Sequence, residues 1–160
     1  MPQRKRKKIM IIEAQGNLLN ANVEAIVNTV NCVGVMGKGL ALAFKQAYPT
    51  NFAQYKEACN VGKVKPGEMF ITKINQTTNP KYIINFPSKR HWREKSYLVD
   101  IELGLVALVA KVKELEINSI AIPALGCGLG GLDWQIVKPL IINAFSILPD
   151  VEVMLFAPKD

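Results

Sequence analysis

Residues 25–48 of the chain read AIVNTVNCVGVMGKGLALAFKQAY, and this stretch decides the fold. It opens with an apolar run at residues 25–30 that is typical of a buried strand, and it closes with the strong helix formers of residues 40–48. The turn between the two runs, from Gly34 to Gly39, is rich in glycine. A buried strand that passes through such a turn into a helix is the building unit of an α/β fold.

A second glycine-rich turn, GCGLGG at residues 126–131, follows the apolar run at residues 119–123. Glycines let the backbone approach a phosphate closely, and the N–H groups at the start of the next helix act as donors. Two such turns in one domain predict a diphosphate held between them, whereas the alternative is that they serve only to reverse the chain. Neither turn has the GxxxxGK[ST] or the GxGxxG order with its acidic partner, which argues against ATP hydrolysis and hydride transfer.

The remaining apolar runs complete an alternating pattern of strands and helices. Strands are predicted at residues 9–14, 68–73, 81–86 and 151–156. One helix is predicted after Pro49 with Thr50 as its N-cap, a second from residue 96 to about residue 116, and a third after Asp133, which Pro139 either distorts or begins. This alternation predicts a three-layer α/β/α sandwich around a central mixed, largely parallel sheet.

Length and composition predict one cytoplasmic domain, residues 9–160, behind a basic tail at residues 1–8. The tail holds five basic residues of a chain with net charge +7, and it is either a solubilising terminus or an arm for nucleic-acid phosphates. Apolar runs too short to span a membrane and the lack of a cleavable leader pattern exclude membrane and secreted classes. We expect a monomer.

The side chains that commonly bind metals are few and scattered. The chain has three cysteines, Cys32, Cys59 and Cys127, and one histidine, His91. Three scattered cysteines and one histidine predict neither a disulfide framework nor a zinc site, and we expect no metal and no cofactor. A cysteine without an acid or histidine partner more often packs as a small apolar residue than acts as a nucleophile.

Residues 86–95, FPSKRHWREK, mix basic and aromatic side chains just before a predicted helix. Cations meet phosphates and rings stack on bases, so this mixture is typical of contact with single-stranded nucleic acid. The candidate DNA contacts are Arg90, His91, Trp92 and Arg93. The alternative is a solvated charge run with Trp92 tucked against the fold.

These motifs together resemble the macro domain family. The resemblance covers residues 11–158 and is carried by GNLL at 16–19, NTVN at 28–31, GVMGKG at 34–39, NFPSKRHW at 85–92 and GCGLGGLDW at 126–134. Within the family these stretches are most similar to the DarG antitoxin branch. Members of that branch remove ADP-ribose from thymidine in DNA and so reverse the toxin DarT.

The resemblance implies where the ligand lies. It places the distal ribose and part of the diphosphate at Asn31, Gly37 and Gly39, and the phosphates on backbone amides of the second turn. The residues implied there are Gly126, Cys127, Gly128, Leu129 and Gly130. It also places Phe156 near adenine, with core packing as the alternative, and puts Asn17 where many macro domains bind adenine with an aspartate.

Lys89 is similar to the catalytic lysine of the DarG branch and of a human enzyme that clears ADP-ribose from glutamate. Its amine could form a Schiff base with the sugar, or its ammonium could stabilise the departing base. Gly130 stands where that human enzyme has an aspartate. The resemblance therefore implies a DNA ADP-ribosyl glycohydrolase that needs no cofactor. A non-catalytic ADP-ribose reader and a hydrolase of protein-linked ADP-ribose remain alternatives.

The resemblance also implies partners. These are ADP-ribose, ADP-ribosylated DNA and a DarT-type toxin, the toxin being bound through a region that this chain does not include. No membrane partner is expected.

Overall fold

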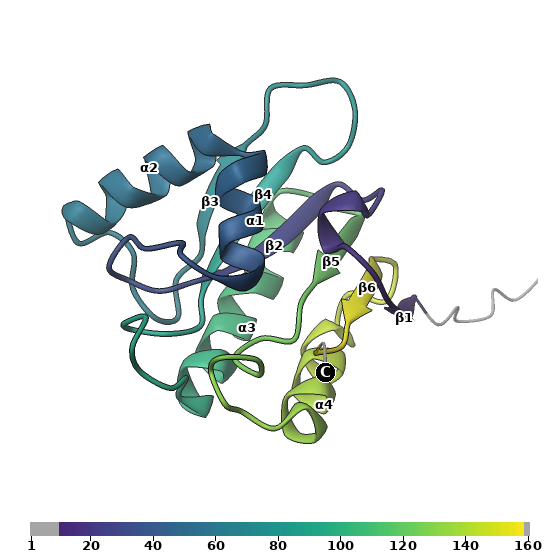
Figure 1. The fold of residues 1–160 in the computed structure, drawn as a ribbon. Coiled ribbons are helices and arrows are strands. Elements are labelled where there is room, and N and C mark those ends of the chain that lie inside the picture. Colours follow the sequence, from purple (N-terminus) through teal and green to yellow (C-terminus); the bar gives the residue numbers. More distant parts are fainter. Residues whose placement is uncertain (1–9, 159–160) are drawn as a thin grey trace, which may run out of the picture.

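A computed structural model describes residues 10–158 of the chain, and the predicted basic tail lies outside them (Figure 1). It contains one sheet of six strands in the order β1-β6-β5-β2-β4-β3. All neighbouring strands are parallel except β3 and β4, which confirms the mixed, largely parallel sheet. The strands are β1 (Ile11–Ala14), β2 (Ala25–Val30), β3 (Phe70–Lys73), β4 (Tyr82–Pro87), β5 (Ser119–Ile122) and β6 (Glu152–Phe156).

Helices cover both faces of the sheet, as predicted for three layers. Helices α1 and α2 pack over one face, and α3 and α4 pack together over the other (Figure 1). Their bounds are α1 (Gly39–Ala47), α2 (Pro49–Asn60), α3 (Leu98–Glu114) and α4 (Trp134–Phe145), and a short 3-10 turn, η1, spans Leu18–Asn20. Between residues 10 and 158, no helix is long and apolar enough to cross a membrane.

Two helix boundaries differ from the sequence prediction. Pro49 occupies the first turn of α2 and Tyr48 precedes it, so the prediction of Thr50 as N-cap is wrong. Proline suits this position because its fixed φ is helical and its missing N–H would have no partner there. At α4 the Asp133 side chain caps the helix by accepting from the Gln135 N–H at 2.9 Å, and Pro139 lies inside the helix and not in its first turn.

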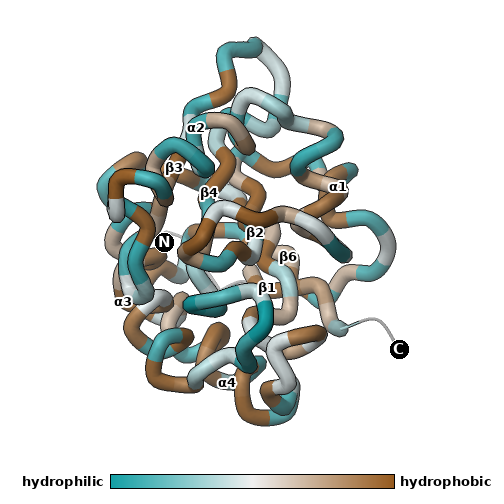
Figure 2. Tube along the Cα trace, turned by 60° about the vertical axis from the view of Figure 1, so that its left-hand side comes forward, coloured by the Kyte–Doolittle hydropathy of each residue, from teal (hydrophilic) through white to brown (hydrophobic). Residues whose placement is uncertain are grey.

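The core follows from the two-residue period of the strands. Along β2, Ala25 and Val27 face the cluster under α3 and α4, while Ile26 faces the cluster under α1. In Figure 2 the strands are largely hydrophobic, whereas α3 and α4 alternate between hydrophobic and hydrophilic turns. Burial on both faces explains why β2 and β4 read as near-continuous apolar runs.

Gly104 allows α3 to lie directly against β4. A Cβ at this position would come within 2.6 Å of Phe86 Cε1 and 3.0 Å of Cε2, and the Phe86 side chain is fully buried. Overpacking of this kind costs about 1–3 kcal/mol, which exceeds the ~1 kcal/mol that alanine gains over glycine inside a helix.

We therefore expect Gly104→Ala to lower the free energy of unfolding in chemical denaturation by about 1 kcal/mol, the middle of the overpacking cost less the gain in helix propensity. Val106→Ala is the matched control because Val106 is 72% exposed on the same helix, and it should change stability by less than about 0.5 kcal/mol. An unchanged or higher stability of Gly104→Ala would show that the helix can move away from Phe86 at no cost.

Candidate functional site

Three segments leave the sheet at the same edge. Strands β5, β2 and β4 are parallel neighbours, so their carboxyl ends lie side by side. The segments that follow them are the first glycine loop (residues 31–39) after β2, the lysine segment (residues 88–97) after β4 and the second glycine loop (residues 123–133) after β5. Ligands of open α/β sheets bind at this edge, which makes it the candidate site.

The lysine segment is hydrogen-bonded to the first glycine loop. The N–H groups of Ser88 and Lys89 donate to the Val30 carbonyl at 2.9 and 3.3 Å, and the Cys32 N–H donates to the Arg90 carbonyl at 3.2 Å. These bonds continue the pairing of β2 with β4 beyond the ends of both strands. The backbone of Lys89 is therefore held by the strand that leads into the first glycine loop.

The same segment also contacts the second glycine loop. The Ser96 N–H donates to the Gly130 carbonyl at 2.9 Å. A Cβ at Gly130 would overlap both the Gly126 carbonyl oxygen and the Ser96 hydroxyl, so this position admits no side chain. The lysine segment thus joins the two loops, and the shape of the second loop depends on how closely it packs on Ser96.

Asn31 organises the first glycine loop. Its side-chain oxygen accepts from the N–H groups of Val33, Gly34 and Val35 at 3.0, 3.1 and 3.3 Å. Its amide donates to the Val35 carbonyl at 2.8 Å, and the buried Tyr55 hydroxyl donates to both oxygens of Asn31. The side chain is 6% exposed, so its first role is to shape the loop, and its predicted ribose contact stays a prediction.

Lys89 is half-buried and its amine has cationic neighbours. Its Nζ donates to the Trp92 carbonyl at 3.5 Å. Burial lowers the pKa of Lys89, and the charges of Lys95 and Lys38 lower it further. Between residues 10 and 158 no carboxylate lies within ion-pair distance of this amine. The surroundings therefore favour the neutral amine more than those of an exposed lysine do.

Arg90 forms an ion pair with Asp100 of helix α3. Its Nε and Nη2 donate to the Asp100 carboxylate at 3.0 and 3.2 Å, and the guanidinium lies 4.4 Å from the centre of the Tyr97 ring. Asp100 is 2% exposed in the first turn of α3. A bidentate pair of this kind fixes orientation as well as charge, so Arg90 and Asp100 form a clamp on the lysine segment. Because its guanidinium is bonded to Asp100, Arg90 has less freedom to reach a DNA phosphate, and its DNA contact stays a prediction.

We expect Asp100→Asn to lower turnover about 10- to 100-fold while leaving ADP-ribose affinity nearly unchanged. The substitution removes the clamp charge, so Lys89 is held less well although both glycine loops remain. Glu102→Gln, an exposed carboxylate in the same helix, is the matched control. Single-turnover kinetics and calorimetry with ADP-ribose measure the two quantities. Equal losses in both would show that Asp100 merely supports the fold of the site.

His91, Trp92 and Arg93 form a stacked cluster at the surface. The His91 and Trp92 rings lie 5.4 Å apart, and the Arg93 guanidinium lies 4.6 Å from the Trp92 ring centre. The Arg93 N–H donates to His91 Nδ1 at 3.1 Å. Trp92 is 45% exposed, which disfavours the alternative of a tryptophan tucked against the fold, and the DNA contacts of this cluster stay a prediction. An exposed ring beside the Arg93 guanidinium suits the stacking of a base.

The remaining predicted site residues fall into open and buried groups. A Cβ added at Gly128 or Gly39 would meet nothing within 4 Å, and Leu129 is 64% exposed, so these positions face open space. A Cβ at Gly37 would meet only Val35 Cγ1, at 3.6 Å. Phe156, in contrast, is 8% exposed and packs with Leu18 and Ile26, which favours the core-packing alternative.

Neither cysteine in a glycine loop is suited to nucleophilic attack. Burial raises the pKa of Cys32 and of Cys127 to about 11, so both thiols are protonated at neutral pH. Asn17 caps η1 by accepting from the Leu19 N–H at 3.0 Å, which gives it a local structural role. Residues 10–158 bring together no three His, Cys, Asp or Glu side chains that could hold a metal ion.

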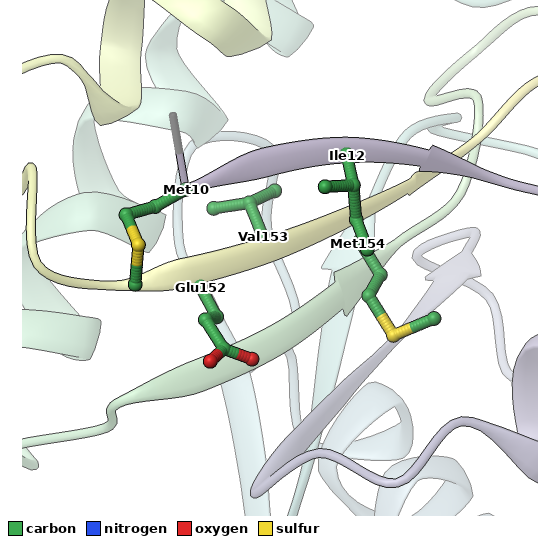
Figure 3. Close-up of a pocket in the computed structure, with 5 residues that line it drawn as sticks. All are labelled: Met10, Ile12, Glu152, Val153 and Met154. Atoms are coloured by element: carbon green, nitrogen blue, oxygen red, sulfur yellow. The ribbon is translucent and has the colours of Figure 1, made fainter. Parts of the chain in front are cut away.

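One hollow of the surface lies away from this edge. It has a volume of about 260 Å³ and is lined by Met10, Ile12, Glu152, Val153 and Met154 (Figure 3). Glu152 is the first residue of β6, so the hollow lies at the amino end of that strand and beside the edge strand β1. The chemistry of a parallel sheet lies at the opposite, carboxyl ends.

Sequence reasoning missed Lys38, Lys95, Ser96 and Asp100. Asp100 carried a usable signal, because it is a carboxylate near Leu98 and Ile101, which point into the core. Lys38 and Lys95 carried none beyond their charge, since their proximity to Lys89 depends on how the loops fold together.

The sequence of the chain is similar to sequences of known proteins. A sequence model of the macro domain family matches residues 27–141. A DNA ADP-ribosyl glycohydrolase of Mycobacterium tuberculosis is 51% identical over 150 residues, which are 94% of this chain and 43% of that protein. The chain therefore spans less than half the length of this curated relative.

Solved structures agree with the sequence comparison. The macrodomain of Mycobacterium tuberculosis DarG has a TM-score of 0.93 and 51% identity, covering 94% of this chain and 99% of that one. Thermosipho africanus DarTG in complex with ADP-ribose has a TM-score of 0.88 and 32% identity, covering 96% of this chain and 43% of that one.

Proposed function

The chain belongs to the macro domain family, and on that premise we propose that it removes ADP-ribose from thymidine bases of single-stranded DNA. The observation that carries the proposal is the lysine segment, which is hydrogen-bonded to both glycine loops and so holds Lys89 between them. The Mycobacterium tuberculosis relative is a DNA ADP-ribosyl glycohydrolase, which supports the same reaction.

ADP-ribose binds across the two glycine loops in this proposal. Backbone N–H groups of both loops donate to the diphosphate, and the open positions at Gly39 and Gly128 let it approach the backbone. The first loop is already ordered by Asn31, so little conformational entropy is lost on binding. The related Thermosipho africanus structure was solved in complex with ADP-ribose, which supports ADP-ribose as the ligand.

The bond that breaks joins the anomeric carbon of the distal ribose to a ring nitrogen of the base. Positive charge builds on the sugar, and the base leaves with the electron pair and takes a proton. Water supplies the hydroxyl that ends on the anomeric carbon. Lys89 acts in one of two ways. Its neutral amine attacks the anomeric carbon as the base leaves, the ribose ring opens to give a Schiff base, and water hydrolyses this to ADP-ribose and the free amine; or its ammonium stabilises the departing base while water attacks the carbon.

The surface beside Lys89 supports nucleic acid as the carrier of the modification. The surface cluster of His91, Trp92 and Arg93 offers a ring for stacking and cations for phosphates. Hydrolysis of protein-linked ADP-ribose by a lysine–aspartate pair like that of the human enzyme is disfavoured, because position 130 has no room for an aspartate.

We further propose that the protein acts as an antitoxin against a DarT-type transferase in the bacterial cytoplasm. A related Thermosipho africanus protein is a fusion of a DNA ADP-ribosyl transferase and a DNA ADP-ribosyl glycohydrolase, 32% identical over 161 residues, which supports this pairing. We expect the domain to act as a monomer.

The test is incubation of the protein with an ADP-ribosylated single-stranded oligonucleotide, followed by mass spectrometry of the DNA. Restored unmodified thymidine together with free ADP-ribose is the expected result. Intact substrate from a sample that still binds ADP-ribose in calorimetry would instead establish the non-catalytic reader. A parallel incubation with ADP-ribosylated glutamate in protein tests the third alternative, and no release is expected there.

A further inference from the structure

Two lysines that the proposed reaction does not use lie in the segments that meet around Lys89. Lys38 immediately precedes α1, between Gly37 and Gly39 of the first glycine loop. Lys95 crosses the second glycine loop, where a Cβ at Gly131 would lie 3.0 Å from its Cδ and 3.3 Å from its Nζ. The three amines therefore come from two segments, the first glycine loop and the lysine segment, which meet at the carboxyl edge of the sheet.

The position of Lys95 is built into the fold. The neighbouring Ser96 N–H is bonded to the Gly130 carbonyl, which pins the backbone beside Lys95 to the second loop. Gly131 has φ +80° and carries no side chain, so the stem of Lys95 can lie across it. Lys95 is thus directed along the loop and not simply outward into solvent.

No counter-charge balances these amines. Lys38 and Lys95 are exposed, and between residues 10 and 158 neither is within ion-pair distance of a carboxylate. The field of both reaches Lys89 strongly enough to lower its pKa. The pKa of Arg90 is raised mainly by Asp100, and Glu94, the carboxylate of the lysine segment, contributes less. Like charges held together are unfavourable unless an anion joins them.

We propose that Lys38 and Lys95 bind the phosphodiester groups of the DNA strand that flank the modified nucleotide. This inference rests on the proposed function and adds to it a specificity device. In the proposed function, backbone amides of the loops bind the diphosphate of ADP-ribose, whereas Lys38 and Lys95 are exposed side chains of the same site. A strand whose base stacks on Trp92 would carry its phosphates past these amines.

Binding of an unmodified, fluorescein-labelled single-stranded oligonucleotide tests the proposal, because it requires no hydrolysis. Anisotropy is measured over a salt series for wild type, Lys38→Gln, Lys95→Gln and the double variant. Lys113→Gln is the matched control, since it removes the same charge from the far end of α3. The logarithm of the binding constant decreases linearly with the logarithm of the salt concentration. We expect this dependence to become shallower by about 0.7 for each site lysine replaced, and to stay the same for Lys113→Gln.

Calorimetry with free ADP-ribose separates the two sources of phosphate. Unchanged ADP-ribose affinity in all variants is expected if the lysines read the strand. A parallel loss of ADP-ribose affinity would assign them to the diphosphate and overturn the proposal. The proposal would also be overturned if Lys38→Gln and Lys95→Gln had the same salt dependence as Lys113→Gln, or if wild type failed to bind the oligonucleotide. Loss of hydrolysis with intact strand binding would refute the proposed function and leave this inference standing.

Discussion

Replacement of Lys89 by alanine is expected to lower the rate of ADP-ribose release from DNA about 10²- to 10⁴-fold, the range for a positioned catalytic group. ADP-ribose affinity should change little. Among residues 10–158 the amine donates only to the Trp92 carbonyl, at 3.5 Å, and the backbone of Lys89, not its side chain, donates to the Val30 carbonyl of β2. Single-turnover kinetics and calorimetry measure the two effects separately.

The pH profile of wild type distinguishes the two roles of Lys89. The pKa of Lys89 is lowered by burial and by Lys95 and Lys38, so the titration falls below the ordinary lysine range. If the neutral amine attacks, the rate rises with pH through this pKa. If the ammonium stabilises the departing base, the rate falls over the same interval. Reduction with borohydride during turnover should attach ADP-ribose to Lys89 in the first case and leave the protein unmodified in the second.

Lys89→Arg serves as the conservative control. Arginine keeps the positive charge and stays protonated at all accessible pH values, so it can stabilise a leaving base but cannot form a Schiff base. Substantial residual activity in Lys89→Arg would exclude covalent capture. Full activity of Lys89→Ala would show that the Lys89 amine has no part in the mechanism.

The second large effect is expected at Gly130. A Cβ there would overlap the backbone carbonyl of Gly126 and the buried hydroxyl of Ser96, and neither atom is the end of a flexible side chain. Strain of this kind costs about 1–3 kcal/mol. If the strain is relieved by reshaping the loop, Gly130→Ala should lower ADP-ribose affinity about 10- to 100-fold, because about 1.4 kcal/mol changes a dissociation constant tenfold.

Gly128 provides a control for the fold of the same loop, and not for affinity, because the diphosphate is proposed to approach the backbone there. A Cβ at Gly128 would meet nothing within 4 Å, and its φ lies outside the left-handed region. Gly128→Ala should therefore retain the fold of the second glycine loop. Calorimetry on Gly130→Ala and wild type, with thermal unfolding of both variants to check their integrity, gives the comparison. If Gly130→Ala binds ADP-ribose as wild type does, the close packing on Ser96 has no part in shaping the ligand site.

The strands and the layers could be predicted because their signals are local. The apolar run at residues 25–30 is β2 in the structure, and the run at residues 119–123 is β5 shortened by one residue. The residues assigned to helix ends were less accurate. Thr50 suits an N-cap by residue type, but Pro49 already begins α2, since a proline in the first turn loses no helical hydrogen bond.

Sequence by itself determined that two glycine-rich turns follow buried strands, and that a basic segment follows another, because strand period, glycine and charge are readable along the chain. Only the tertiary structure decided which side chains meet. Parallel pairing in the order β5-β2-β4 brings Lys38, Lys89 and Lys95 to one edge, while the contact of Arg90 with Asp100 restrains a residue that charge alone assigned to DNA. The physical reason is that electrostatic and packing energies depend on distances between segments remote in sequence, and those distances exist only once the sheet has assembled.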